Sequence, residues 1–422
     1  MFTQFEARHY KCLKQVKIEL APFNILIGPN ASGKSTLLDI AGFLQDALQS
    51  DVEQAVRNRA PSLSELVWQE KPFQTDSSTP EFELAVNVKI PNTLLRSGYD
   101  QVRYEVCIGK DEQEGIVVQR ENLWLVNTQQ FRNGTAAQPT LFPIEPDDTS
   151  SVVHPSHTRT PAGYRLVVRK NYPGNDYFRS ETTGWNITFR LSPRRLALSG
   201  IPEDQERFPI ALWLKSFLLT QIQILQLHST WMRQPTPADA PQTFQPDGSN
   251  LPVIAARLKE IHPQRFEWWV GHLQTILPDL QTIEIFQRPE DRAQYLVVSY
   301  KTGLKVPAWL LSDGTLRLLA LTLIAYLPPQ DHVFLIEEPE NGIHPRAIEG
   351  VFQALSSVYQ GQIFLATHSP LVLALSHPAQ LLVFAKTSTG ATAVIRGHHH
   401  PALRAWKSDL SLDTLFAAGV LE

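Results

Sequence analysis

The sequence predicts an α/β protein with a mainly parallel central sheet, and three observations carry that expectation. An apolar strand at residues 23–28 leads into a glycine-containing loop, and an apolar helical pattern follows that loop up to residue 49. Two further apolar tetrapeptides, VFLI and IFLA, stand between helical patterns near the end of the 422-residue chain. Strands that alternate with helices are typical of a parallel sheet covered by helices.

The composition narrows the class of protein. The chain has 43% hydrophobic residues, enough for a sizeable core, and its length allows two or three domains. Its two cysteines, Cys12 and Cys107, are too few for a disulfide framework. The N-terminus lacks a signal-peptide pattern, and no apolar run reaches the roughly 18 residues needed to cross a bilayer. We expect a cytoplasmic protein with no membrane partner. The net charge of −4 shows no basic excess, so DNA would have to bind through a local basic patch.

Four segments follow one another along the chain. Residues 1–79 contain the strand–loop–helix unit. Residues 80–205 hold strand-like stretches separated by polar turns, which predict an antiparallel β subdomain. Residues 206–290 show apolar helical patterns around a Pro-rich connection and predict a helical insertion. Residues 291–422 return to the alternation of strands and helices, so we expect them to complete the domain that the first segment begins.

The loop of the first segment reads GPNASGKST and has the spacing G-x-x-x-x-G-K-[ST]. Its residues are Gly28, Pro29, Asn30, Ala31, Ser32, Gly33, Lys34, Ser35 and Thr36. The two glycines let backbone N–H groups face phosphate oxygens, and the helix N-terminus adds a partial positive charge. In such loops the lysine reaches the β- and γ-phosphates and the serine hydroxyl ligates Mg²⁺. The loop therefore predicts that ATP and Mg²⁺ bind here.

The stretch HVFLIEEPENGIHP places two carboxylates, Glu337 and Glu338, directly after an apolar strand. Ligands of open α/β sheets bind outside the carboxyl ends of the strands. Adjacent strand residues point to opposite sides, so one carboxylate can serve Mg²⁺ while the other polarises a water molecule. We assign Glu337 to the metal and Glu338 to the water. Taken alone, the pair could equally be two solvated glutamates at a strand end.

Two shorter stretches add candidate phosphate contacts. LSDGT precedes an apolar helix; Ser312 or Asp313 can cap that helix, while Gly314 and Thr315 leave its amides open to an anion. IFLATHSP places His368 after another buried strand, where an imidazole can contact a γ-phosphate or the attacking water. Each stretch alone is more often structural, as an ordinary capped helix or a lone histidine.

Taken together and in this order, GPNASGKST, LSDGT, LIEEPENGIHP and THSP resemble the motifs of ABC-type ATPases. More narrowly, the chain resembles the RecF- and SMC-like group of AAA-family ATPases that includes the ATPase half of OLD-family proteins. The resemblance implies a P-loop NTPase fold whose ABC-type head is split by the β and helical regions. It further implies that ATP is held between two copies, by the phosphate loop of one and by Ser312–Thr315 of the other. Glu338 would then be the catalytic carboxylate and His368 the switch histidine.

Three positions depart from the ABC pattern. Glu337 stands where transporters usually have Asp, although the narrower group commonly carries Glu. Asp313 replaces the second glycine of the signature, and we expect its carboxylate to point away from phosphate. The glutamine that senses Mg²⁺ is not obvious, and Gln69 in LVWQEKP is the candidate third metal-site residue.

These motifs predict an enzyme that hydrolyses ATP, dimerises around it, and acts as a switch or sensor subunit in DNA metabolism or defence against phage. Only 54 residues separate His368 from Glu422, so we expect a separate, nuclease-like effector protein. A non-hydrolysing, ATP-dependent structural or DNA-binding scaffold is the alternative that Glu337 and Asp313 leave open. A transporter ATPase is less favoured, because the inserted middle region does not fit one.

Overall fold

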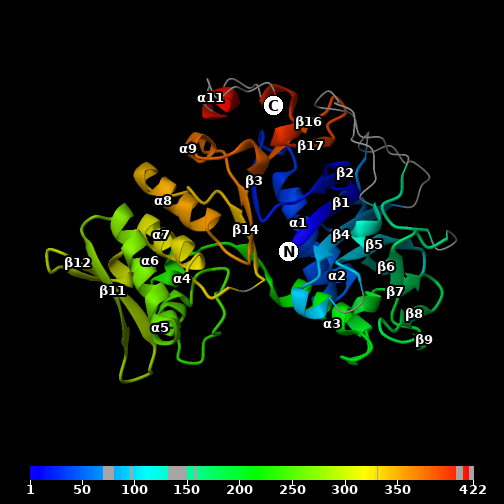
Figure 1. The fold of residues 1–422 in the computed structure, drawn as a ribbon, viewed down its shortest axis with the longest axis horizontal. Coiled ribbons are helices and arrows are strands. Elements are labelled where there is room, and N and C mark those ends of the chain that lie inside the picture. Colours follow the sequence, from blue (N-terminus) through cyan, green and yellow to red (C-terminus); the bar gives the residue numbers. More distant parts are fainter. Residues whose placement is uncertain are drawn as a thin grey trace.

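The computed structural model describes residues 1–69, 80–95, 98–131, 150–155, 159–329, 331–404 and 412–417, and Figure 1 shows its fold. The largest sheet of this described part has eight strands and is antiparallel throughout. Its strands, in spatial order, are β2 (Leu13–Glu19), β1 (Phe2–Tyr10), β4 (Glu81–Lys89), β5 (Gln101–Asp111), β6 (Gly115–Val126), β7 (Tyr164–Asn171), β8 (Asp176–Arg179) and β9 (Asn186–Phe189). The first two strands of the chain thus join the same sheet as the strands of segment 80–205.

The second sheet has six strands and confirms the parallel sheet predicted from the sequence. Its strands, in spatial order, are β10 (Ile222–Leu225), β14 (Val333–Glu337), β15 (Gln362–Ala366), β3 (Phe23–Ile27), β16 (Leu381–Lys386) and β17 (Thr392–Arg396). All neighbours are parallel except β16 and β17, which form an antiparallel pair at one edge. Every residue of β3 and β15 is buried, as expected for central strands covered on both faces.

A small third sheet lies apart from the other two. Its antiparallel strands are β11 (Leu280–Gln287), β12 (Gln294–Tyr300) and β13 (Lys305–Pro307). The helices are α1 (Lys34–Gln49), α2 (Val52–Arg57), α3 (Pro209–Thr220), α4 (Ser229–Met232), α5 (Leu251–Ile261), α6 (Pro263–Ile276), α7 (Asp313–Ile324), α8 (Pro345–Ser356), α9 (Pro370–Ala374), α10 (Pro401–Arg404) and α11 (Leu412–Ala417). Segment 206–290 therefore contains helices α3 to α6 and also strands β10 and β11.

The six-stranded sheet separates two hydrophobic cores. Leu26 of β3 faces a core shared with α1 and the eight-stranded sheet, whereas its neighbours Ile25 and Ile27 face a core shared with helices α5 to α8. This alternation follows from the two-residue period of a strand. Figure 1 accordingly shows α1 and α7 on opposite sides of β14. The carboxyl edge of the sheet is left between these two layers.

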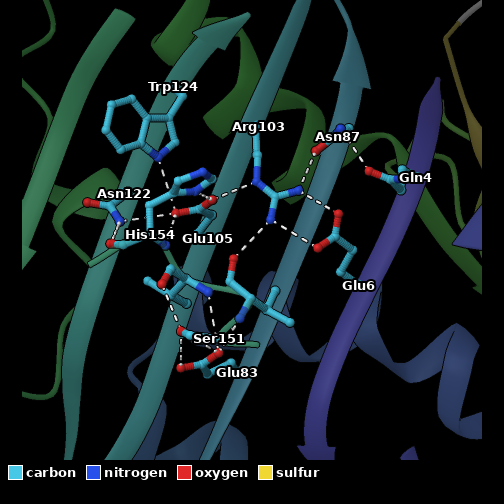
Figure 2. A network of polar contacts seen from close by, with 12 residues as sticks. Gln4, Glu6, Glu83, Asn87, Arg103, Glu105, Asn122, Trp124, Ser151 and His154 are labelled. Carbon is cyan, nitrogen blue, oxygen red and sulfur yellow. Dashed lines mark hydrogen bonds and ion pairs between the residues drawn. The ribbon is translucent and has the colours of Figure 1, made fainter. Parts of the chain in front are cut away.

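The face of the eight-stranded sheet that points away from α1 is charged, yet it is buried. Figure 2 shows Arg103 of β5 between the carboxylates of Glu6 and Glu105, under the segment that carries His154. The Arg103 guanidinium lies 2.8 Å from a Glu6 oxygen and 2.6 Å from a Glu105 oxygen. Burial alone would raise the pKa of Glu105, but hydrogen bonds and positive charge from His154 and Arg103 lower it to about 2. The buried charges of this face are therefore paired with one another.

Among the described helices, none has both the length and the apolar character that a bilayer-spanning segment needs.

Candidate active site

Three neighbouring parallel strands bring the predicted motifs to one edge of the six-stranded sheet. Strand β15 lies between β14 and β3, with Ala366 paired both to Glu337 at the end of β14 and to Leu26 of β3. Gly28 follows β3, and His368 follows β15 by two residues. Because parallel strands end at the same edge, the phosphate loop, the paired glutamates and the histidine meet there.

The phosphate loop has a backbone that only glycine accommodates at two positions. Gly28 has a φ of 146°, and a Cβ atom there would lie 2.3 Å from the carbonyl oxygen of Phe384 in β16. Gly33 has a φ of 103°, and its Cβ would lie 2.4 Å from the Thr392 hydroxyl oxygen. That hydroxyl also donates a hydrogen bond of 2.9 Å to the Ser32 carbonyl. Strands β16 and β17 thus hold the loop from behind, which leaves its amides for a ligand.

The side chains of the loop fit a bound triphosphate. The Lys34 ammonium donates hydrogen bonds to the Gly28 and Pro29 carbonyls, at 2.8 and 2.9 Å, and so folds back over the loop. Burial lowers the pKa of Lys34, while the negative charges of Glu337 and Glu338 raise it, so the lysine and both carboxylates share one electrostatic environment. The ammonium group that would meet a phosphate oxygen therefore already lies at the loop.

The two glutamates differ in their surroundings. Glu337 ends β14 and is exposed, as is Ser35 at the start of α1; these are the oxygen donors that would hold Mg²⁺. Glu338 has a φ of 45°, a left-handed conformation that is uncommon outside glycine and recurs at functional sites. Its amide donates 2.7 Å to the Ala366 carbonyl, and its carboxylate accepts a short hydrogen bond from the Asn341 side chain. The turn after β14 therefore fixes Glu338 at the sheet edge.

His368 is half-buried in the turn between β15 and α9. Its amide donates 3.3 Å to Glu340, whose carboxylate also accepts a 2.6 Å hydrogen bond from the Thr367 hydroxyl. The loop after β14 and the turn after β15 are consequently tied to each other. These contacts bring the turn that carries His368 against the loop that carries Glu340, and the role of the histidine at a phosphate stays a prediction.

The structure shows which residue of the signature stretch, Leu311–Thr315, caps α7. Ser312 is the cap, and its hydroxyl oxygen accepts 3.2 Å from the Thr315 amide. Asp313 turns toward Arg233, which lies 2.5 Å away, and this hydrogen bond and charge lower the pKa of Asp313. Gly314 packs against the loop after β14: a Cβ there would lie 2.3 Å from the Gly342 carbonyl oxygen. The charge of the Asp313 carboxylate is thus balanced by Arg233 of the same copy.

Gln69 lies in the segment beside the end of β1, where the neighbouring Trp68 amide bonds to the His9 carbonyl. Its side-chain amide donates 3.2 Å to the Ser64 carbonyl and is exposed, so a role at the metal stays a prediction. Sequence reasoning did not identify Arg233 or Glu340 as parts of the site. No motif surrounds Arg233 in the sequence, whereas Glu340 lies within the stretch HVFLIEEPENGIHP that carries the two glutamates.

Solved structures similar to this chain include SMC head domains. A crystal structure of an SMC head bound to the C-winged helix domain of ScpA has a TM-score of 0.51 and 15% identity, covering 93% of this chain and 97% of that one. An SMC head with an extended coiled coil, bound to the C-terminal domain of ScpA from Pyrococcus furiosus, has a TM-score of 0.49 and 12% identity, covering 99% and 98%. The first of these shows that the chain has the ABC-type P-loop ATPase fold that the motifs predicted.

Sequence comparison gives a family but no individual relative. A search of the curated proteins found no match. The model of one family, described as "AAA domain, putative AbiEii toxin, Type IV TA system", matches residues 23–374, which is well over half of the chain and includes every motif described above. The chain therefore belongs to this family of AAA-domain proteins, and its fold is that of an ABC-type P-loop ATPase head.

Proposed function

We propose that the protein hydrolyses ATP between two copies of itself and uses the reaction as a switch for a separate effector. One observation carries the proposal: β3, β14 and β15 deliver a phosphate-binding loop, a pair of carboxylates and a histidine to the same sheet edge. Hydrolysis of a triphosphate needs these parts, namely amides and a lysine for the phosphates, a metal ligand set, and a group that orients water.

Each residue has a role that its surroundings support. The amides of the loop and Lys34 bind the phosphates, and Ser35 and Glu337 hold Mg²⁺, which neutralises charge on the phosphate oxygens when bound. Glu338 orients the attacking water and accepts its proton, while His368 donates to the γ-phosphate. The hydrogen bond from Asn341 keeps the Glu338 carboxylate from rotating freely.

The arrangement of the two layers supports a shared site. Ser312 caps the start of α7, and Figure 1 shows α7 and α1 on opposite sides of β14. Ser312 is exposed, and its helix terminus carries the partial positive charge that suits a γ-phosphate. In a symmetric pair, the α7 tip of one copy would close the site of the other, an isologous contact made twice. Asp313 does not oppose such a contact, because Arg233 balances its charge.

The effector and the cellular role rest on the comparisons. The similar SMC head was crystallised with a domain of a second protein, ScpA, which suggests that this head also works with a partner. The family description names a putative toxin of a type IV toxin–antitoxin system. Defence against phage and DNA metabolism both stay open as the cellular role, with a nuclease-like effector and DNA as the partners to look for first.

Steady-state ATP turnover of the wild-type chain and of Glu338→Gln tests the enzymatic part. We expect slow, Mg²⁺-dependent release of phosphate that falls by about 10²–10⁴-fold in the variant, the usual contribution of a general base. Nucleotide binding should survive in Glu338→Gln but not in Lys34→Ala. Equal phosphate release by wild type and Glu338→Gln would reject hydrolysis and favour the scaffold alternative.

A further inference from the structure

Glu340 lies at the centre of the contacts between the two strand-end turns. Its Oε1 accepts hydrogen bonds from the Thr367 hydroxyl at 2.6 Å and from the His368 amide at 3.3 Å. The residue follows the water-orienting Glu338 by two positions, and Asn341 next to it contacts that glutamate. Glu340 thus lies in the turn that carries Glu338 and is hydrogen-bonded to the turn that carries His368.

The second oxygen of this carboxylate is unexplained by the fold. Oε2 of Glu340 is buried and has no hydrogen-bond partner among the described residues. Its surroundings are apolar, since Glu340 lines a small pocket with Pro339, Ile343, Leu365 and Val372. An unpaired acceptor in such a place is costly, because burial removes its water without supplying a donor. A buried acceptor of this kind calls for a functional explanation.

The imidazole of His368 is a donor that could satisfy it. Because Oε1 of the same carboxylate already accepts from the His368 backbone amide, the ring N–H of this histidine is the candidate donor for Oε2. Carboxylates that accept from one ring nitrogen fix the tautomer and the orientation of the imidazole, which leaves the other nitrogen for the substrate. The alternative is that Glu340 only holds the backbone of the turn, through Oε1.

We propose that Glu340 is a positioning residue: one oxygen holds the Thr367–His368 turn, and the other accepts the ring N–H of His368 when the histidine engages the γ-phosphate of ATP. The inference rests on the proposed function, because it concerns the same hydrolytic site. It adds to the residues that contact ATP a residue, Glu340, that orients one of them, His368.

Glu340→Gln separates the two tasks of the carboxylate. Glutamine keeps an oxygen that can accept from Thr367 and from the His368 amide, but it replaces the second oxygen with an NH₂ group that cannot accept. Glu340→Asp keeps two acceptors on a shorter stem, and Thr367→Val removes only the hydroxyl that braces Oε1. Glu349→Gln, an exposed carboxylate on the neighbouring helix α8, is the matched control.

The readouts are kcat and KM for ATP, the affinity for a fluorescent ATP analogue, and the thermal midpoint of each purified full-length variant. We expect Glu340→Gln to lower kcat by about 10- to 100-fold, as loss of an orienting partner does, with KM within about twofold and an unchanged thermal midpoint. Glu340→Asp should retain more turnover than Glu340→Gln. Thr367→Val should also lose less turnover than Glu340→Gln, and Glu349→Gln should match wild type.

Two results would overturn the inference alone. One is wild-type kcat in Glu340→Gln while Glu338→Gln is inactive. The other is a joint loss of stability and nucleotide affinity in Glu340→Gln, which would show a purely structural role. If the wild-type chain itself releases no more phosphate than Glu338→Gln, the proposed function fails first and this inference falls with it.

Discussion

Replacing Gly314 with Ala tests whether the start of α7 is really packed against the loop after β14. Alanine favours helix over glycine by about 0.8–1.0 kcal/mol, so propensity alone predicts a more stable protein. The structure predicts the opposite, because the new Cβ would lie 2.3 Å from the Gly342 carbonyl oxygen, where ordinary contact begins at 3.4 Å. The added Cβ would therefore be 1.1 Å too close (3.4 minus 2.3), and turning a side chain cannot relieve the contact because the neighbouring atom belongs to the backbone.

The net effect follows from these two terms. Overpacking typically costs about 1–3 kcal/mol, so after the propensity gain we expect Gly314→Ala to lose up to about 2 kcal/mol of unfolding free energy. Gly271 in α6 is the matched control, because a Cβ there meets nothing within 4 Å. Gly271→Ala should gain up to about 1 kcal/mol from propensity alone. Displacing Gly342 should also disturb Asn341 and Glu338, and so lower ATP turnover.

Urea denaturation followed by circular dichroism measures both variants against wild type. The reasoning predicts shifts of opposite sign in the unfolding free energy, with reduced kcat for Gly314→Ala only. Equal stabilisation of the two variants, with turnover intact, would refute the close approach of α7 to the Gly342 loop.

The buried charges in Figure 2 give two further predictions. Arg103→Ala should lower the free energy of unfolding by about 3–5 kcal/mol, because it leaves the Glu6 and Glu105 carboxylates buried without their cation. Arg57 is exposed, so Arg57→Ala should cost less than about 0.5 kcal/mol. Urea titration compares the two variants, and similar values would contradict the network. The pKa of Glu105 is lowered from 4.5 to about 2, so its stabilisation is complete above pH 4.5 and is lost as the pH falls toward 2. Stability measured from pH 6 to pH 2 should fall less steeply over that window in Glu105→Gln than in wild type, and parallel curves would refute the assignment.

Local patterns predicted the parts of the site that lie at strand ends. The phosphate loop, Glu337, Glu338 and His368 each follow a buried strand, and a parallel sheet brings strand ends together whatever lies between them in sequence. The sheet order that makes β15 the neighbour of both β14 and β3 was not readable from those patterns.

The interactions that sequence could not supply are those between distant polar side chains. Arg233 precedes Asp313 by 80 positions, and only the fold of the connection before α5 brings the two together. Glu340 was visible within ENGIHP, but its bond to Thr367 depends on the register between β14 and β15. The joining of β1 and β2 to strands of segment 80–205 likewise rests on the pairing of β1 with β4, which are separated in sequence by β2, β3, α1 and α2, and no local pattern encodes that pairing.

The central claim, that ATP is held between two copies, is tested most directly by the mass of the Glu338→Gln protein in solution. Sedimentation equilibrium with Mg²⁺ should give 47.6 kDa without nucleotide or with ADP, and twice that mass with saturating ATP, because the variant binds ATP without consuming it. Lys34→Ala should stay at the lower mass throughout. A Glu338→Gln protein that is saturated with ATP and yet remains at 47.6 kDa would contradict the account.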